Sequence, residues 1–213
     1  MSGALQAVFQ NQRSFTPPIP TIGAAFGGGF FAGQISTAGN SIADYNLVIG
    51  PYASAQAFPK QFKTTRTTTS GTSSDIDGPT NSSNMNNASH PAAQFCEGLT
   101  IGGFSDWYMP AKNELEVCFY NLKPIANSNN TSSGTNTNAV PSRGSNYTSG
   151  VPAQTSATSF QSGGSEAFDG STYWSSTQFD ASEAKVQSFY YATQNNYYKD
   201  GNRRVRAIRR VAV

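Results

Sequence analysis

The chain has 213 residues, of which 37% are hydrophobic and only 12% are charged, and its formal net charge is +2. The low charge excludes disorder driven by self-repulsion, and 14 Phe with 10 Tyr supply enough aromatic material for a core. A net charge this small gives no indication of nucleic-acid binding. We therefore expect one folded domain of good size, or a core domain with a small N-terminal attachment.

Cysteine and histidine are scarce, which limits the chemistry that the chain can perform. Cys96 and Cys118 are the two cysteines, and His90 is the only histidine. Two cysteines are too few for a disulfide scaffold, and no Cys/His cluster has the spacing of a metal site. We expect no metal, no cofactor and no histidine-based catalytic triad. The sequence also lacks the pattern of a signal peptide and a segment of membrane-spanning length, so no membrane insertion is expected.

The first 60 residues are expected to form an arm followed by a β-hairpin. The string "TPPIP" at residues 16–20 favours a rigid extended segment. Residues 30–36 and 45–50 have the composition of strands, joined by a turn at Gly39–Asn40. Residues 60–88 are rich in Thr, Ser and Asn and predict a loop with a turn at Asp77–Gly78. We place a domain boundary after residue 60 and assign residues 61–213 to a second, larger domain.

Apolar residues then recur at helical spacing in two segments. The stripe within residues 89–99 is Ala92, Phe95, Cys96 and Leu99, and the stripe within residues 112–123 is Leu115, Cys118, Phe119 and Leu122. Ser89 is expected to cap the first helix, and Pro124 to end the second. Both cysteines lie on these stripes, which favours small core residues over nucleophiles.

Residues 125–171 have no periodicity and are too many for an ordinary connection, which predicts a functional loop excursion, a flexible insertion, or both. Three strands are expected after them, at residues 172–178, 185–193 and 203–213. A tight turn is expected at Asp200–Gly201, and a bulge near Ala207. The arginines of the last segment alternate with Val, Ala and Ile, which favours a terminal strand over a basic tail for nucleic acid or a membrane surface.

Three motifs in this order resemble the DUF1566 family, also known from the C-terminal domain of Legionella collagen-like adhesins. "DWYMPAKNEL" supplies Asp106, Trp107, Pro110, Glu114 and Leu115, "YWSST" supplies Trp174, Ser175, Ser176 and Thr177, and "RRVRAIRR" supplies Val205, Arg206, Ile208 and Arg209. The resemblance covers about residues 75–213. Two positions depart from the pattern: Met109 replaces the usual Leu, and Ala111 replaces the usual Ser or Thr. The second change removes half of a capping box, at a cost of about 1 kcal/mol.

The resemblance implies an α+β chain with a C-type-lectin-like fold of the formylglycine-generating-enzyme type. Such a domain has two helices on a small twisted antiparallel sheet below long irregular loops, and here a small N-terminal β segment precedes it. The motif residues are then structural, and Glu114 caps backbone amides or pairs with an arginine such as Arg206 or Arg209. The related enzymes need an active-site cysteine pair that holds copper, whereas Cys96 and Cys118 lie on helix stripes. We therefore expect that the chain is not an enzyme.

The tract "SFYYATQNNYYKDGN" near the C-terminus is the expected ligand-binding segment. The candidate residues are Tyr190, Gln194, Asn195, Asn196, Tyr197, Tyr198, Lys199 and Asn202. Tyrosine gives broad contact area with few torsions, and amides give adaptable hydrogen bonds, a combination typical of binding surfaces and of saccharide recognition. The alternative is that Tyr190 and Tyr191 only fill the faces of the sheet. Exposure is favoured for residues 195–198, beside a turn.

The segment "GGGFFAGQI" and the strand after it are similar to a segment that precedes this domain in tailed-phage proteins. The two resemblances together imply a bacteriophage virion protein: a tail-fibre tip, a head fibre or a capsid decoration. Residues 1–60 would attach to other virion proteins or build an oligomer, a trimer by analogy, and the lectin-like part would bind a host-cell glycan or protein. The alternative is a structural cement protein whose loops contact neighbouring subunits. A formylglycine-generating-type enzyme is the third hypothesis.

Overall fold

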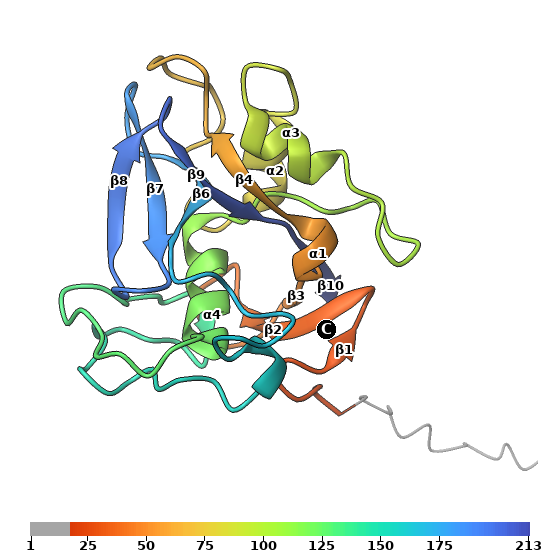
Figure 1. Cartoon of the computed structure of the whole chain (residues 1–213), viewed down its shortest axis with the longest axis vertical. Helices are drawn as coiled ribbons and strands as arrows, with labels where there is room; N and C mark the ends of the chain where they lie inside the picture. The colour runs from red at the N-terminus through yellow and green to blue at the C-terminus, as the bar shows by residue number, and fades with distance from the viewer. Residues whose placement is uncertain (1–17) are drawn as a thin grey trace, which may run out of the picture.

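The computed structural model describes residues 18–213, which form an α+β body dominated by strands (Figure 1). The strands are β1 (Ala25–Phe26), β2 (Gly29–Ile35), β3 (Tyr45–Ile49), β4 (Gln56–Gln61), β5 (Ala139–Val140), β6 (Thr172–Gln178), β7 (Glu183–Ser188), β8 (Gln194–Tyr198), β9 (Asn202–Arg206) and β10 (Ile208–Ala212). The helices are α1 (Tyr52–Ala55), α2 (Gly78–Ser83), α3 (Pro91–Glu97) and α4 (Lys112–Leu122), with a 3₁₀ turn at Thr158–Phe160. Most of the arm expected before the hairpin lies outside the described residues.

The first sheet has the strand order β1-β2-β3-β10, and β5 also pairs with β2. The expected hairpin of residues 30–36 and 45–50 is confirmed as β2 and β3. Gly33 lies at a bulge in β2 with φ +123°, and a Cβ there would meet Asn121 Nδ2 at 2.3 Å. Glycine therefore lets α4 approach this strand closely, and Asn121 Nδ2 donates to the Ala32 carbonyl at 2.8 Å.

The second sheet has the order β4-β9-β6-β7-β8, so the structure has two five-stranded sheets where one small sheet and a separate N-terminal β segment were expected. The strand expected at residues 203–213 is in fact two strands, one in each sheet. Ala207 is the residue between them: its N–H donates to the Ala55 carbonyl at 2.9 Å, and its carbonyl accepts from Gly50 N at 3.0 Å. The expected bulge is therefore a change of sheet.

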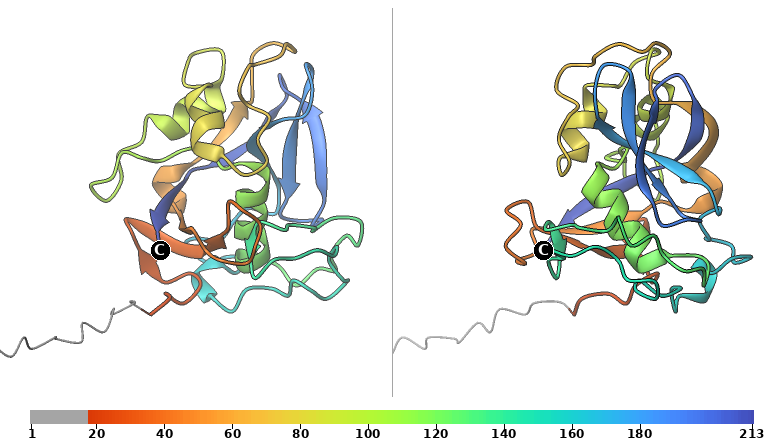
Figure 2. Two further views of the ribbon diagram at one scale, coloured as in Figure 1. Left: turned by 180° about the vertical axis from the view of Figure 1, so that it is seen from behind. Right: turned by 90° about the vertical axis from the view of Figure 1, so that its left-hand side faces the viewer.

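This arrangement joins the early and late parts of the chain. β10 pairs with β3 in the first sheet, and β9 pairs with β4 in the second. Residues 25–61 thus belong to the same packed body as the strands of the C-terminal region, as Figures 1 and 2 show. The boundary expected after residue 60 falls inside β4.

Both expected helices are present, as α3 and α4. The N-cap of α3 is His90 rather than the expected Ser89, and it makes no side-chain capping bond. An additional short helix, α2, begins where a turn was expected, and the Asp77 carboxylate accepts from Thr80 N at 3.3 Å to cap it. The Asp77–Gly78 pair therefore starts a helix rather than a simple turn.

The core has two clusters of buried side chains. α4 contributes its stripe of Leu115, Cys118, Phe119 and Leu122 to the first cluster, against β2 and β3. Trp107 and Trp174 lie in the second cluster, which also packs α2 and α3 against the second sheet. α4 is the central helix of the body, between the two sheets (Figures 1 and 2).

Residues 125–171 form irregular loops that lie along α4 (green to cyan in Figure 1) and contain only β5 and the 3₁₀ turn. Lys123 at the end of α4 is 2% exposed, and its ammonium donates to Asn129 Oδ1 at 2.6 Å and to the Pro152 carbonyl at 3.2 Å. A buried cation thus holds two parts of the long excursion together.

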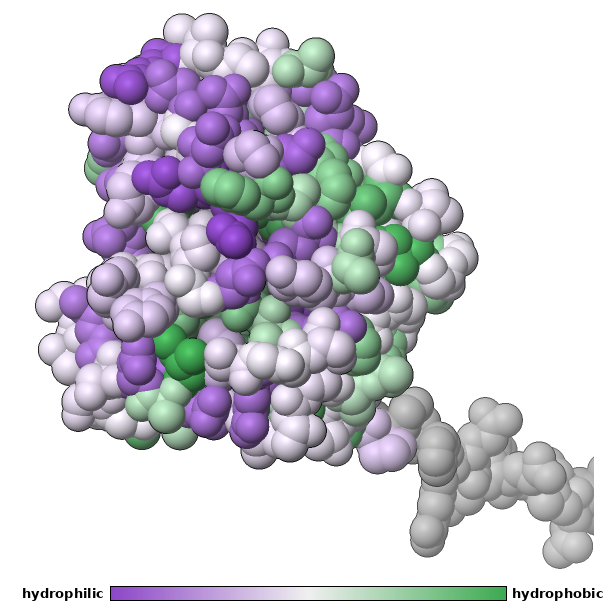
Figure 3. All heavy atoms as spheres, in the orientation of Figure 1, coloured by the Kyte–Doolittle hydropathy of each residue, from purple (hydrophilic) through white to green (hydrophobic). Residues whose placement is uncertain are grey.

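The face shown in Figure 3 is covered mainly by hydrophilic and neutral residues, with small hydrophobic patches between them. Within residues 18–213, no helix combines the length and the apolar character needed to cross a bilayer.

Candidate ligand-binding surface

The expected ligand-binding tract folds into a hairpin of β7 and β8 at one edge of the second sheet. The strand expected at residues 185–193 ends at Ser188, because Ser188 Oγ accepts from Tyr190 N at 3.3 Å and Tyr191 N at 3.0 Å and turns the chain. Ala192 continues this turn with φ +57°. A separate strand, β8, therefore follows where none was expected.

Three of the candidate residues line a shallow hollow beside this edge. The hollow has a volume of about 240 Å³ and is lined by Lys112, Phe179, Lys185, Val186, Gln194, Asn195 and Asn196. We call it the hairpin hollow. Phe179 is 55% exposed and is the one large aromatic ring among the lining residues.

Two of the polar groups in the hairpin hollow are already engaged. Lys185 forms an ion pair with Asp75 at 2.9 Å. Gln194 Oε1 accepts from Gly134 N at 3.3 Å, which ties β8 to the long loop. Among the described residues, by contrast, the Lys112 ammonium makes only a long contact of 3.4 Å with Asn113 Oδ1. The hollow thus offers amides, a cation and an aromatic ring to a ligand rich in hydroxyl or other oxygen groups.

Tyr197 and Tyr198 do not form one aromatic surface, which corrects their grouping in a single site. They are neighbours on a strand, so their side chains point to opposite faces of the sheet. The Arg203 guanidinium lies over the Tyr197 ring at 4.1 Å, and the Arg66 guanidinium lies over the Tyr198 ring at 3.8 Å. One face of each ring is therefore covered by a cation of the same chain.

Lys199 was expected to contact a ligand but is buried, at 0% exposed. Its ammonium donates to Gln178 Oε1 at 2.6 Å and to the carbonyls of Thr67, Asp180 and Ala181 at 3.0, 2.7 and 2.9 Å. A cation with four acceptors inside the protein holds loops together. Its assignment as a ligand-binding residue is wrong.

The remaining candidates lie outside the hairpin hollow. Tyr190 is 44% exposed in the turn between β7 and β8, where its ring makes an edge contact with Tyr191. Its exposure excludes the alternative in which both tyrosines only fill the sheet. Asn202 is exposed at the start of β9 and does not line the hollow. The expected tract is therefore divided among a turn, an edge strand and a buried lysine.

The motif residues form the contacts between helices and sheets. Trp107 and Trp174 are 1% and 0% exposed, and Leu115 is 1% exposed. Ser176 N donates to the Pro110 carbonyl at 2.7 Å, and Ser175 Oγ donates to the Lys185 carbonyl at 2.8 Å. The first two motifs are thus joined directly by a backbone hydrogen bond.

The arginines of the third motif pair differently from the expectation. Glu114 does cap a backbone amide, accepting from Ala111 N at 2.8 Å, but its ion pair is with Arg210 at 2.8 Å. Arg206 pairs instead with Glu166 at 3.0 Å, and Arg209 with Asp106 at 2.7 Å. Burial raises the pKa of Glu114, while Arg210 opposes that shift. Sequence alone could not assign three arginines of one segment to three partners.

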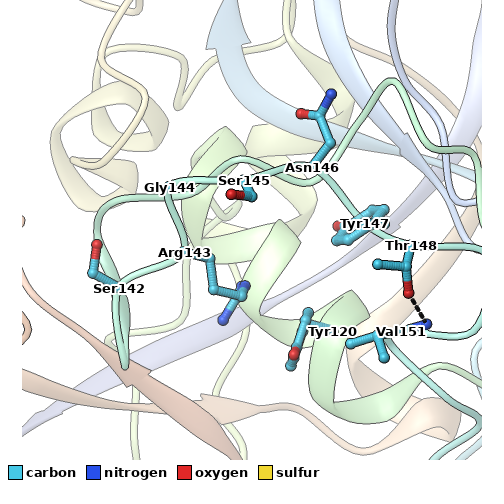
Figure 4. A pocket seen from close by; sticks show the side chains of 9 residues that line it. All are labelled: Tyr120, Ser142, Arg143, Gly144, Ser145, Asn146, Tyr147, Thr148 and Val151. Atoms are coloured by element: carbon cyan, nitrogen blue, oxygen red, sulfur yellow. Dashed lines mark hydrogen bonds between the residues drawn. The ribbon is translucent and has the colours of Figure 1, made fainter.

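A second hollow, which we call the Arg143 pocket, was not expected from the sequence (Figure 4). It has a volume of about 310 Å³ and is lined by Tyr120, Ser142, Arg143, Gly144, Ser145, Asn146, Tyr147, Thr148 and Val151. Loop residues 142–148 surround one side of it, and Tyr120 of α4 lies on the other (Figure 4). The only signal in the sequence is the mixture of Arg, Ser, Asn and Tyr within an aperiodic stretch.

The Arg143 side chain is held in place by an aromatic ring and by a buried carboxylate. Its guanidinium stacks on the Tyr120 ring at 3.9 Å, and Nη2 pairs with the buried carboxylate of Glu116. Asn136 and Tyr147 also donate to Glu116. Arg143 Nε is buried without an acceptor, a situation that costs about 1–3 kcal/mol when nothing else binds the group.

Both cysteines lie in the core, in different clusters: Cys118 in the first and Cys96 in the second. Burial raises the pKa of each thiol, so both are protonated at neutral pH. His90 is 4% exposed and bonded to Thr69 and Asn87. Residues 18–213 contain no cluster of three His, Cys, Asp or Glu side chains that could hold a metal ion.

Comparison with known proteins gave no matching family model and no matching curated protein.

Proposed function

We propose that the chain is a non-enzymatic virion protein of a tailed bacteriophage, displaying a C-type-lectin-like domain of the DUF1566 type that binds a saccharide of the host surface. Two features support the domain assignment: the α+β architecture, and the contacts that join "DWYMPAKNEL" to "YWSST" through Pro110 and Ser176. The virion location rests on the N-terminal resemblance to tailed-phage proteins. The N-terminal residues then attach the domain to the particle, in an oligomer.

The hairpin hollow is the observation that carries the binding function. Gln194 and Asn196, which share one face of β8 with Lys185 of the neighbouring strand, bring amides to a surface that also contains the exposed Phe179 ring and the Lys112 ammonium. Saccharides are bound by stacking of their C–H faces on aromatic rings and by hydrogen bonds from amides to hydroxyls. The hollow is shallow and small, which suits one or two sugar units of a longer glycan.

The test is binding of the purified, fluorescently labelled chain to an array of bacterial surface glycans. We expect saturable binding that is lost in the variant Asn196→Ala, since its amide lines the hollow, and kept in Tyr191→Ser, which alters an exposed residue outside it. Absence of saturable binding to any glycan, or equal loss in both variants, would contradict the proposal.

A structural cement function is the second candidate, and β8 favours it. This strand lies at the edge of its sheet, where unpaired backbone groups can add a strand from a neighbouring subunit. Particles that lack the protein distinguish the two functions. A cement protein binds tightly to such particles and restores their resistance to heat. Neither the parent chain nor the variants of the hairpin hollow then bind a glycan.

A further inference from the structure

We propose that the Arg143 pocket is a second saccharide site, which binds the carboxylate of an acidic sugar unit. It is separate from the hairpin hollow, and the inference stands whether or not that hollow has a ligand. The pocket volume of about 310 Å³ lies at the small end of the range for ligand sites and suits one sugar unit.

The charges of the pocket favour an anionic ligand. Among the nine lining residues, Arg143 is charged and none carries a carboxylate. Glu116, below the pocket, is 0% exposed at its side chain, and its two oxygens are occupied by Asn136, Tyr147 and Arg143. The carboxylate of Glu116, which orients Arg143, is therefore buried, and a ligand in the pocket contacts the guanidinium and not this carboxylate.

The guanidinium has unused hydrogen-bonding capacity. Within residues 18–213, its ion pair uses Nη2, Nε is buried without an acceptor, and Nη1 makes no hydrogen bond and is not buried, so Nη1 is the donor that a ligand can reach. The stack on Tyr120 fixes the plane of the group without using any N–H. A guanidinium held in place with an open Nη1 can donate a charge-assisted hydrogen bond to a carboxylate oxygen of a ligand.

The rest of the lining fits the remainder of a sugar ring. Ser142 and Ser145 add hydroxyls, and Val151, which is 50% exposed, adds an apolar wall for ring C–H groups (Figure 4). The lining thus combines a cation with hydroxyl groups and an apolar side chain, the groups that an acidic sugar contacts.

The test uses two probes that differ only at the carboxylate: a hexuronate oligosaccharide and the same oligosaccharide with its carboxyl groups reduced to alcohols. Dissociation constants are measured for the full chain by titration calorimetry at low salt. We expect the reduced probe to bind at least about tenfold more weakly, and the hexuronate affinity to fall as salt is added.

Three substitutions of glycine test whether the hexuronate binds in the Arg143 pocket. A side chain at Gly144 or at Gly150 meets no atom within 4 Å of its Cβ, and Gly150 does not line the Arg143 pocket. Gly144→Glu brings a carboxylate to the rim and should weaken hexuronate binding at least about tenfold. Gly144→Gln, of the same size without the charge, should weaken it less than Gly144→Glu does, and Gly150→Glu, with the charge elsewhere, should leave it nearly unchanged. Unfolding temperatures of all three should match the parent chain.

Absence of hexuronate binding overturns the inference, as does equal affinity for the reduced probe. An equal loss in Gly150→Glu would mean that overall charge, rather than the Arg143 pocket, governs binding, and would also overturn it. These outcomes are independent of Asn196→Ala, so failure here and failure of the hairpin hollow are distinguishable.

Discussion

Arg209 binds Asp106 through two parallel hydrogen bonds, from Nε to Oδ1 at 2.7 Å and from Nη2 to Oδ2 at 2.9 Å. The same guanidinium donates from Nη1 to the Gly27 carbonyl at 2.9 Å and stacks on the Phe104 ring at 3.8 Å. One side chain of β10 thus joins the first motif to the turn between β1 and β2. The planar fork of arginine is what makes all of these contacts possible at once.

Arg209→Lys should therefore lower the free energy of unfolding by about 1 kcal/mol, since lysine keeps the charge but loses the paired geometry, and Asp106 is too exposed for a larger effect. The hydrogen bonds from Arg209 hold the pKa of Asp106 below its ordinary value. The contribution of this ion pair to the free energy of unfolding is present above about pH 3.9, the ordinary pKa of aspartate. It is lost as the pH falls through the lower pKa that Asp106 has in the folded chain. Urea unfolding at neutral pH and near pH 3 checks it: the difference between variant and parent should shrink in acid.

Because the pKa of His90 is lowered in the folded chain, we expect a loss of stability at mildly acid pH. Burial, followed by the nearby Lys63 and Lys199, lowers the pKa of His90 to about 4. The unfolded chain therefore binds a proton below about pH 6.5 that the folded chain does not bind until about pH 4, so stability falls as pH falls across this window. Between about pH 7 and pH 4.5 the loss from this residue should be about 2–3 kcal/mol.

The check is urea unfolding of the parent chain and His90→Gln at both pH values. The glutamine amide can keep hydrogen bonds to Thr69 and Asn87 without titrating. The parent should lose more stability than the variant on acidification. An equal loss in both chains would show that other groups cause it.

Substitution of Lys199 should affect the stability of the chain, whereas substitution of Lys112 should affect its ligand binding. Lys199→Met leaves four acceptors without their donor and should lower the free energy of unfolding by about 1–3 kcal/mol. Lys112→Met should leave stability nearly unchanged but weaken ligand binding in the hairpin hollow, which its side chain lines. Urea unfolding and binding of the labelled chain are measured on both variants. Unchanged stability with weaker ligand binding in Lys199→Met would contradict this prediction and would assign Lys199 to the ligand site.

Local patterns predict much of this fold. The stripe that ends at Leu122 predicts α4, and the aromatic and β-branched residues of 172–178 predict β6, because each depends on neighbours in the sequence. The change of sheet at Ala207 depends instead on hydrogen bonds to Ala55 and Gly50, which are about 150 positions away. No property of Ala207 itself indicates it.

The site was predictable only in part, for a related reason. Once β8 is recognised as a strand, the period of two places Tyr197 and Tyr198 on opposite faces. Burial of Lys199 follows from four acceptors on separate loops, which sequence cannot bring together. The Arg143 pocket depends on Glu116, a charged residue of α4 whose burial the helical pattern does not predict.

The most direct test of the proposed binding function is the affinity of the labelled chain for cells of the host bacterium that the proposal implies, with Phe179→Ser compared with Tyr191→Ser. Both variants remove an exposed aromatic ring, at 55% and 67% exposed, but only Phe179 lines the hairpin hollow. The account predicts at least about tenfold weaker binding for Phe179→Ser, parental binding for Tyr191→Ser, and unchanged unfolding temperatures for both. Parental binding by Phe179→Ser would contradict it.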